Sequence, residues 1–269
     1  MTRSLTDLPA AARTAARAPL TPALLGLAGA ELRRMLRNPM FAVGTIGFPV
    51  MFFALFGLSA VNETTAAGVK VGPLILVNFG AYSLLSLAMF SFGSAVALER
   101  TGGWLRLLRA SPMPAGVYFG GKVAAALCFS ALSLGVLYAF AHLAGGVTIP
   151  AGTALLLLLK MLLGMIPLIA MGLCVGFLVS PAAAQITANI VSVLMSFASG
   201  LFTPLGSMPD FIQRAAPYLP ASHLGAVARG TVAGQTGAEA GHWLALAAFT
   251  LLFGTLAAWG LRRDEAREQ

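Results

Sequence analysis

The chain has 269 residues, of which 58% are hydrophobic and 10% are charged, and its mean hydropathy is +0.85. Soluble domains carry about 25% charged residues, so this composition excludes a single soluble domain. Each crossing of a bilayer needs about 20 apolar residues, so the length predicts about five to seven membrane-spanning helices joined by short loops. No room remains for a large domain outside the membrane.

The net charge is +8, from 17 Lys and Arg against 9 Asp and Glu. A basic balance often indicates a nucleic-acid partner, but here the basic residues cluster beside apolar runs, as they do at the cytosolic flanks of membrane helices. We therefore expect these basic residues to contact membrane lipids and not nucleic acid. Cys128 and Cys174 lie inside apolar runs and have neither disulfide nor metal-site spacing.

Residues 1–21 are predicted to form a cytosolic tail, because Arg3, Arg13 and Arg17 occur there without the apolar core of a signal peptide. Residues 22–38 carry an apolar stripe backed by arginines, which is typical of a helix lying in the membrane plane. An ordinary basic flank ahead of a span fits this segment equally well.

Six apolar runs then predict an all-α integral membrane protein with six transmembrane helices. The runs are interrupted by short polar loops, by a longer charged connection after the second run, and by a segment rich in Pro, Gly and aromatic residues at 203–238. A short charged tail, 262–269, ends the chain. The predicted spans cover about 41–61, 73–98, 119–143, 151–179, 185–202 and 242–261.

An even number of spans places both termini on one side of the membrane, and the basic residues indicate which side. Three loop bases, Lys70, Arg214 and Arg229, fall on the side away from the termini, against 13 on the terminal side. The positive-inside rule therefore predicts that both termini are cytosolic. The 13 are Arg3, Arg13, Arg17, Arg33, Arg34, Arg37, Arg100, Arg106, Arg109, Lys122, Arg262, Arg263 and Arg267.

One motif resembles a nucleotide site. Residues Gly116 to Lys122 match the first seven positions of the phosphate-binding pattern G-x-x-x-x-G-K, but the eighth position is Val123 instead of Ser or Thr. An apolar span follows and no strand precedes the motif, so the context of a true P-loop is missing. We interpret the match as chance and Lys122 as an interfacial base that anchors the third span. No cofactor is expected on this chain.

Two features inside the fourth predicted span leave alternatives open. Lys160 is the one charge well within a span as drawn, and it either serves a function there or extends its side chain outward to the interface. No Asp or Glu falls within any span as drawn, which argues against a proton-coupled carrier. The pattern Gly172-x-x-x-Gly176 predicts close helix contact, either within one subunit or between two subunits.

Polar side chains form stripes along the second and fifth predicted spans. In the fifth span their spacing of four and three residues places them all on one helical face. Such stripes either bond neighbouring helices or face a partly wet pathway, and both can hold together. The candidate pathway residues are Ser83, Ser86, Phe90 and Ser94 in the second span, and Gln185, Asn189, Ser192, Ser196 and Ser199 in the fifth.

Three segments together resemble the permease subunits of type-2 ATP-binding-cassette (ABC) exporters, a class that includes bacterial drug and antibiotic efflux permeases. The resemblance extends from about residue 25 to 261, so residues 22–261 are identified as one transmembrane domain. The segments are Glu31 to Pro39 before a span with Gly47-Phe48-Pro49, Glu99 to Pro112 continuing to Lys122, and Ser199 to Pro204 followed by Met208-Pro209 and Pro217 to Pro220, ending near Arg229.

The resemblance implies that residues 99–111 form a coupling helix that fits a cleft on a separate ATPase subunit. In that helix the leucines would make apolar contacts and the arginines polar ones. ATP and Mg would then be bound by the partner subunit, and this chain by itself would not be an enzyme. The implied coupling residues are Glu99, Arg100, Trp104, Leu105, Arg106, Leu108 and Arg109.

The resemblance also implies that residues 203–238 form re-entrant outer helices that cap the exit of a pathway. In the family two permeases pair, either two copies or two homologues, with two ATPase subunits, and their second and fifth spans line the path. Those are the spans in which the polar stripes occur. The implied outer-gate residues are Phe202, Pro204, Pro209, Pro217 and Pro220.

These implications predict a permease in the bacterial plasma (inner) membrane that exports a hydrophobic or amphipathic compound, such as a drug, an antibiotic or a lipid-like molecule. Two alternatives remain from the residues themselves. Lys160 and the polar stripes also fit an ion-coupled carrier that works without ATP. A membrane-embedded sensor or assembly factor, with no transport activity, fits the lack of a large domain outside the membrane.

Overall fold

The computed structural model describes residues 20–66, 68–103, 113–235, 237 and 239–267, and all the named elements within them are helices. Within these ranges six helical runs are long and apolar enough to cross a membrane, which confirms the predicted all-α fold with six spans. Their ends differ from the predicted ones by at most four residues. The spans are Pro39–Ala60, Val71–Thr101, Ala115–Gly145, Ala151–Leu178, Pro181–Ala198 and Ala240–Asp264.

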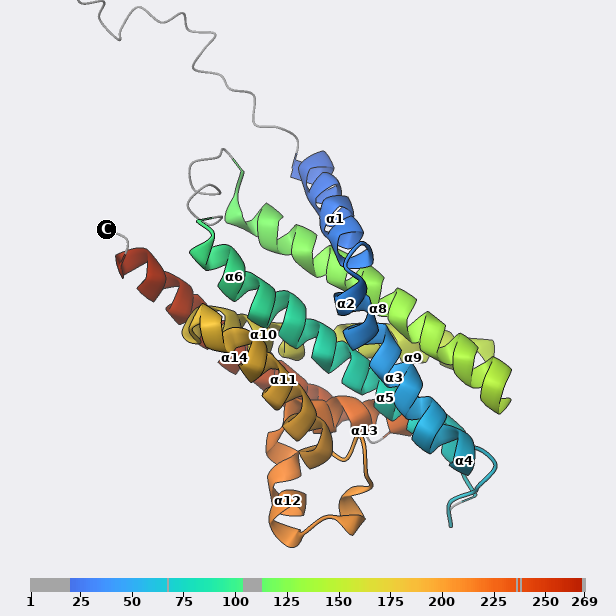
Figure 1. Ribbon diagram of the computed structural model, residues 1–269. Coiled ribbons are helices and arrows are strands. Elements are labelled where there is room, and N and C mark those ends of the chain that lie inside the picture. The colour runs from blue at the N-terminus through green and yellow to red at the C-terminus, as the bar shows by residue number, and fades with distance from the viewer. Residues whose placement is uncertain (1–19, 67, 104–112, 236, 238, 268–269) are drawn as a thin grey trace, which may run out of the picture.

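The second span is the core of the bundle. It consists of α5 (Val71–Ala88), the π-helical turn η5 (Met89–Ser94) and α6 (Ala95–Thr101). In its most apolar window 78% of the residues are buried, against 17–50% in the other spans. Figure 1 shows this span running through the bundle with other helices on both sides. Because it contacts most other helices, any displacement of the second span is transmitted to them.

The first and fourth spans are interrupted where proline removes a backbone donor. The first consists of α2 (Pro39–Ala42), η3 (Val43–Gly47), α3 (Phe48–Phe52), η4 (Phe53–Gly57) and α4 (Leu58–Ala60), and its first π-helical turn ends two residues before Pro49. The fourth divides into α9 (Ala151–Gly164) and α10 (Ile166–Leu178), with Pro167 in the first turn of α10. Both breaks follow from the ring of proline, which cannot continue regular α-helical bonding.

Helix α1 (Leu20–Leu36) lies beside the start of α8 (Ala115–Gly145), the third span (Figure 1). Two glycines allow this approach, since a Cβ on Gly121 would come within 2.8 Å of Leu27 and one on Gly120 within 3.3 Å of Leu24. The predicted helix at 22–38 is therefore present. Leu24 and Leu27 of this helix pack against this protein's own third span.

The start of α1, the end of α6, the start of α8 and the end of α14 (Ala240–Arg267) gather at one end of the bundle (Figure 1). We call this the basic end, because seven of the basic residues that the structure describes belong to the segments that meet there. The other end, at which α5 begins and α8 ends, is called the opposite end. The seven are Arg33, Arg34, Arg37, Arg100, Lys122, Arg262 and Arg263.

The named elements between the fifth span, α11 (Pro181–Ala198), and α14 in the described residues are 3₁₀ turns and short helices. The turns η6 (Leu205–Ser207) and η7 (Ala216–Tyr218) flank α12 (Asp210–Ala215), which projects away from the bundle (Figure 1). Helix α13 (Pro220–Val232) instead packs against α5, α9 and α14. Of these elements α13 is the one largely covered by protein, whereas most residues of η6, α12 and η7 are exposed.

Gly172 and Gly176 bring α10 against the second span of the same chain. A Cβ on Gly172 would lie 2.5 Å from the carbonyl oxygen of Ala88, and one on Gly176 would lie 2.5 Å from that of Phe92. Of the two interpretations that the sequence left open, contact within one subunit is the one that the structure shows.

We expect Gly172→Ala to lower the stability of the purified protein by about 1–3 kcal/mol, because the added methyl group must push two helix backbones apart. The measurement is thermal or denaturant unfolding in detergent. Gly254→Ala is the matched control, since nothing lies within 4 Å of a Cβ at that position on α14. Equal stability of the two variants would show that the α10 contact tolerates a Cβ.

Candidate functional site

A buried ion cluster joins three helices at the basic end. The ammonium of Lys122, on α8, is 2% exposed and donates to Oε1 of Glu31 on α1 and to Oε1 of Glu99 on α6, each at 2.8 Å. Lys122 thus anchors the third span, as predicted, but through two carboxylates of this chain that enclose its charge; its position at the membrane interface stays a prediction. The pairing links helices that are 91 and 23 residues from Lys122 in the sequence.

Arg34 and Tyr118 complete this cluster. Arg34 lies 2.8 Å from Glu31 and 3.5 Å from Glu99, and the Tyr118 hydroxyl donates to Glu99. Burial raises the pKa of Glu31, but Lys122 and Arg34 outweigh burial and hold that pKa below its ordinary value. Two cations thus balance two carboxylates, and we call these five residues the basic-end cluster.

Arg100 joins α6 to the fourth and sixth spans. Its guanidinium donates to the carbonyl oxygens of Gly176 (3.1 Å), Phe177 and Val179 (3.3 Å), where α10 ends, and lies 3.1 Å from Asp264 of α14. The last carbonyls of a helix lack partners within the helix, so Arg100 caps α10 and ties it to the end of the second span.

The implied coupling residues divide into two groups. Trp104, Leu105, Arg106, Leu108 and Arg109 lie outside the described residues. Glu99 and Arg100 are described, and both side chains bind helices of this chain. They therefore hold the end of α6, where the connecting segment begins, against α8 and α10, and their implied contact with an ATPase stays a prediction.

The polar stripe on α11 divides into a buried part and an open part. Ser192, Ser196 and Ser199 are buried, and the Ser196 hydroxyl donates to the carbonyl of Ser192 at 2.6 Å within the same helix. Gln185 and Asn189 are exposed and line a cavity of about 580 Å³. One half of the stripe is thus buried in the bundle, and the other half lines the cavity.

The same division holds for the second span. Ser83 bonds the carbonyl of Thr45 (2.8 Å) and the hydroxyl of Ser133 (2.7 Å), so it ties three helices together, and Ser86 is fully buried. Phe90 and Ser94 line the cavity, where Ser94 donates to Oε1 of Gln185 at 2.5 Å.

This cavity lies between the first span, the region η5–α6 and α11, and it extends to the basic-end cluster. Its lining combines amide, hydroxyl and charged groups with aromatic and aliphatic side chains. Such a mixed lining suits a compound that has both polar and apolar parts. The polar residues are Arg34, Asn38, Ser91, Ser94, Glu99, Gln185 and Asn189, and the large apolar ones are Met35, Met40, Phe41, Val43, Phe48, Phe90 and Leu98.

Phe202, the first of the implied gate residues, lies in an aromatic cluster beyond the end of α11. Its ring centroid is 4.8 Å from that of Tyr82, 5.0 Å from Phe197 and 5.3 Å from Phe52. Rings from the first, second and fifth spans therefore meet at Phe202. Of the four prolines, Pro204, Pro209 and Pro217 are exposed and Pro220 is buried at the start of α13. Whether these residues gate a pathway stays a prediction.

Lys160, on α9, is paired with a carboxylate of this chain. Its ammonium binds both carboxylate oxygens of Glu239 at 2.7 Å and the Thr231 hydroxyl at 3.1 Å, and its side chain is 14% exposed. Glu239 precedes α14 by one residue and therefore fell outside the spans as drawn. Because α13 and the start of α14 bring this carboxylate against α9, the charge of Lys160 is balanced within the protein. The two roles predicted for Lys160 both stay predictions.

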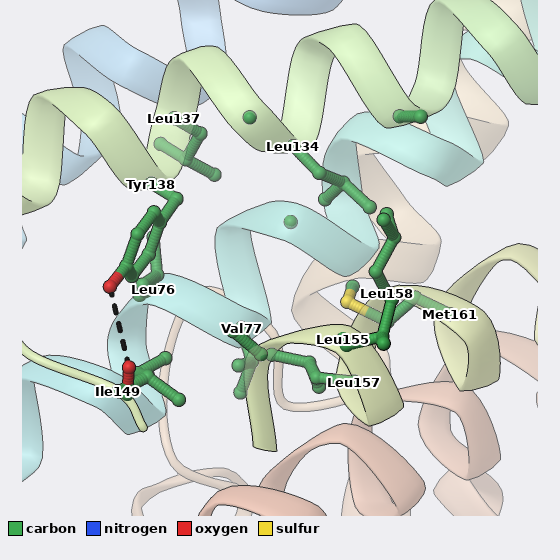
Figure 2. A pocket seen from close by; sticks show the side chains of 14 residues that line it. Leu76, Val77, Leu134, Leu137, Tyr138, Ile149, Leu155, Leu157, Leu158 and Met161 are labelled. Atoms are coloured by element: carbon green, nitrogen blue, oxygen red, sulfur yellow. Dashed lines mark hydrogen bonds between the residues drawn. The ribbon is translucent and has the colours of Figure 1, made fainter. Parts of the chain in front are cut away.

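An apolar pocket of about 260 Å³ lies between α5, α8 and α9 (Figure 2). Leu134, Leu158 and Met161 point into it, and the Tyr138 hydroxyl donates to the carbonyl of Ile149 at 3.5 Å along one side. It is separate from the mixed cavity, and its lining offers few polar groups to orient a ligand.

Within the described residues no group of three His, Cys, Asp or Glu side chains is placed to hold a metal ion.

Sequence reasoning missed three pairings: Lys122 with Glu31 and Glu99, Lys160 with Glu239, and Arg229 with Asn78, whose Oδ1 accepts from the guanidinium at 2.8 Å. Each involves a charge beside or within an apolar run. That position signals a required partner, but the sequence does not reveal which one.

Two comparisons bear on this architecture. A protein of Bacillus subtilis (strain 168) named "Putative transport permease YvfS" is 25% identical over 240 residues, which cover 88% of this chain and 96% of the relative. The family model described as "ABC-2 type transporter" matches residues 23–233. That match covers α1, the first five spans and α13. The chain therefore belongs to the ABC-2 type transporter family of membrane proteins.

Proposed function

We propose that this chain is the permease subunit of an ATP-driven exporter that moves a hydrophobic or amphipathic compound, with ATP hydrolysed by a separate ABC ATPase. Family membership supports a transport component that works with an ABC ATPase. We infer the substrate class from the mixed cavity of about 580 Å³. Drug, antibiotic and lipid-like molecules share the required combination of a polar group and an apolar body.

The proposed orientation places the basic end in the cytosol of a bacterial plasma membrane. The positive-inside rule supports it, since the described bases of the basic end far outnumber Lys70, Arg214 and Arg229 at the other. The cavity then begins at the cytosolic interface, where Arg34 and Asn38 lie, and continues along α11. A compound would enter from the cytosol or the inner leaflet.

The proposed assembly contains two permeases and two ATPase subunits. Helix α11 supports pairing with a second copy or a homologue, because only 22% of its most apolar window is buried in this chain. Gln185 and Asn189 lie on it beside exposed Ile186 and Ile190. Pairing along this helix would enclose the polar cavity between two permeases, which keeps its amide groups away from lipid.

The proposed coupling uses the segment between α6 and α8, which contains the residues implied to bind the ATPase. Both ends of this segment are anchored, one by Glu99 and Arg100 and the other by Tyr118 and Lys122. Movement of the segment would therefore displace α1, the second span and α10 together. Such a rigid-body shift is a common way to open a cavity first to one side of the membrane and then to the other.

The first test concerns the cavity. We expect Asn189→Trp to fill the space beside Gln185, and so to lower transport of amphipathic fluorescent dyes in proteoliposomes by about tenfold or more, with basal ATPase activity retained. Leu251→Trp is the control, because Leu251 is 70% exposed on α14 and does not line the cavity. Full transport by the Asn189 variant would contradict the proposed path.

The second test concerns coupling. Arg100→Met removes the cap of α10 and the link to Asp264, so we expect the complex with the ATPase to keep basal hydrolysis and to lose about tenfold or more of its stimulation by transported compound. Arg100→Lys should recover part of the stimulation, since an ammonium replaces some of the bonds of the guanidinium fork.

Arg262→Gln serves as the matched control for the Arg100 variants, because it removes an exposed base at the same end of the bundle. ATPase activity is measured with and without dye at equal amounts of assembled complex. Unchanged stimulation in Arg100→Met would show that this linkage does not carry the coupling.

A further inference from the structure

A polar pocket of about 330 Å³ lies at the opposite end of the bundle. It shares no lining residue with the mixed cavity. It is formed by α13, the start of α5, the loop before α5 and the start of α14. Its polar lining includes Arg229, Gln235, Glu239 and His242, and Leu74 lies on its apolar side. The proposed transport path uses none of these residues.

Arg229 has no counter-charge among the residues that the structure describes. In the part of the chain that the structure describes, its hydrogen-bond partner is the neutral amide of Asn78, at 2.8 Å, and no carboxylate lies within ion-pair distance of it. Asn78 is the eighth residue of α5, so it lies about 10 Å along the helix from its first residue. An unbalanced guanidinium at this depth is costly unless a ligand or water compensates it.

Glu239 does not supply the missing charge, although it lines the same pocket. Both of its oxygens bind Lys160 at 2.7 Å, and it also accepts from Thr231 and Trp243 at 3.3 Å each. This carboxylate is therefore satisfied by its own cation. The pocket region holds two basic side chains, Lys160 and Arg229, for one carboxylate, which leaves a net attraction for an anion.

We propose that this pocket binds the phosphate group of a phosphate ester through Arg229. A guanidinium has five N–H donors in a planar fork that matches phosphate oxygens, and Asn78 engages one of its terminal nitrogens. His242 also lines the pocket, with Nδ1 held 2.9 Å from Nδ1 of His223. The phosphate can come from a lipid headgroup, whose acyl chains would follow Leu74, or from a free phosphate ester.

The decisive variant is Asn78→Asp, which changes the side chain little in size and gives Arg229 a carboxylate in the place of the amide. Binding is measured by titrating the detergent-purified, delipidated full-length protein with phosphatidylglycerol and counting bound lipid by native mass spectrometry. We expect Asn78→Asp to weaken binding by about tenfold or more, the loss that corresponds to a charge-assisted hydrogen bond. Arg229→Gln should weaken it at least as much.

Arg214→Gln is the matched control, because Arg214 is an exposed base on α12 that does not line the pocket. Since Arg229→Gln removes a part-buried group and can impair folding, Asn78→Asp keeps the test decisive. Wild-type affinity in Asn78→Asp, or an equal loss in Arg214→Gln, would overturn the proposal.

Two further ligands separate the sources of the phosphate. Diacylglycerol has the acyl chains without the phosphate, and glycerol 3-phosphate has the phosphate without the chains. If phosphatidylglycerol binds and glycerol 3-phosphate binds much more weakly, the source is a lipid headgroup, whereas equal binding of the two assigns a free phosphate ester. Diacylglycerol binding as tightly as phosphatidylglycerol would overturn the phosphate assignment.

Discussion

The contact between Lys122 and two carboxylates is the constraint on which the basic end depends. An ammonium that is 2% exposed is stable only if its charge is balanced, and the balance here comes from two other helices. Removing one partner of a buried ion pair typically costs about 3–5 kcal/mol, because the remaining charge stays buried. Helices α1, α6 and α8 are therefore fixed to one another wherever this cluster is intact.

This fixed unit continues into the bundle through the second span. At the basic end Arg100 caps α10, and farther along Gly172 and Gly176 let the backbones of α10 and the second span touch. Two helices that are joined both by a charged cap and by direct backbone contact move as one unit more easily than they slide past each other. The π-helical turn η5 lies within this tightly packed stretch and contributes Phe90 and Ser94 to the mixed cavity, so displacement of the second span also changes the cavity wall.

The sequence was sufficient to predict the six spans, since each depends on a long apolar run, and also the helix before the first span. It was less informative about the polar stripes, because helical periodicity gives a face but not what covers it. Serine can satisfy its hydroxyl on the carbonyl four residues earlier, as Ser196 does, and is then compatible with full burial. The larger amides of Gln185 and Asn189 need space, and they are the ones that reach the cavity.

Ion partners were beyond sequence reasoning for a different physical reason. Glu239 meets Lys160 across 79 residues because α13 packs against α9 and α5, and this return depends on tertiary packing that no local pattern encodes. The spacing of charges in the sequence therefore gave no sign of which cations were balanced.

Charge balance distinguishes the two ends of the molecule. In the basic-end cluster two carboxylates face two cations, so each group has an internal partner and the cluster needs no ligand to be stable. At the opposite end Lys160 and Glu239 satisfy each other, whereas Arg229 has an amide as its partner. A neutral amide can accept a hydrogen bond but cannot offset the desolvation of a charge. An arrangement that served stability alone would favour a carboxylate at position 78, so the amide at Asn78 is better explained by an anion that binds Arg229 from the pocket.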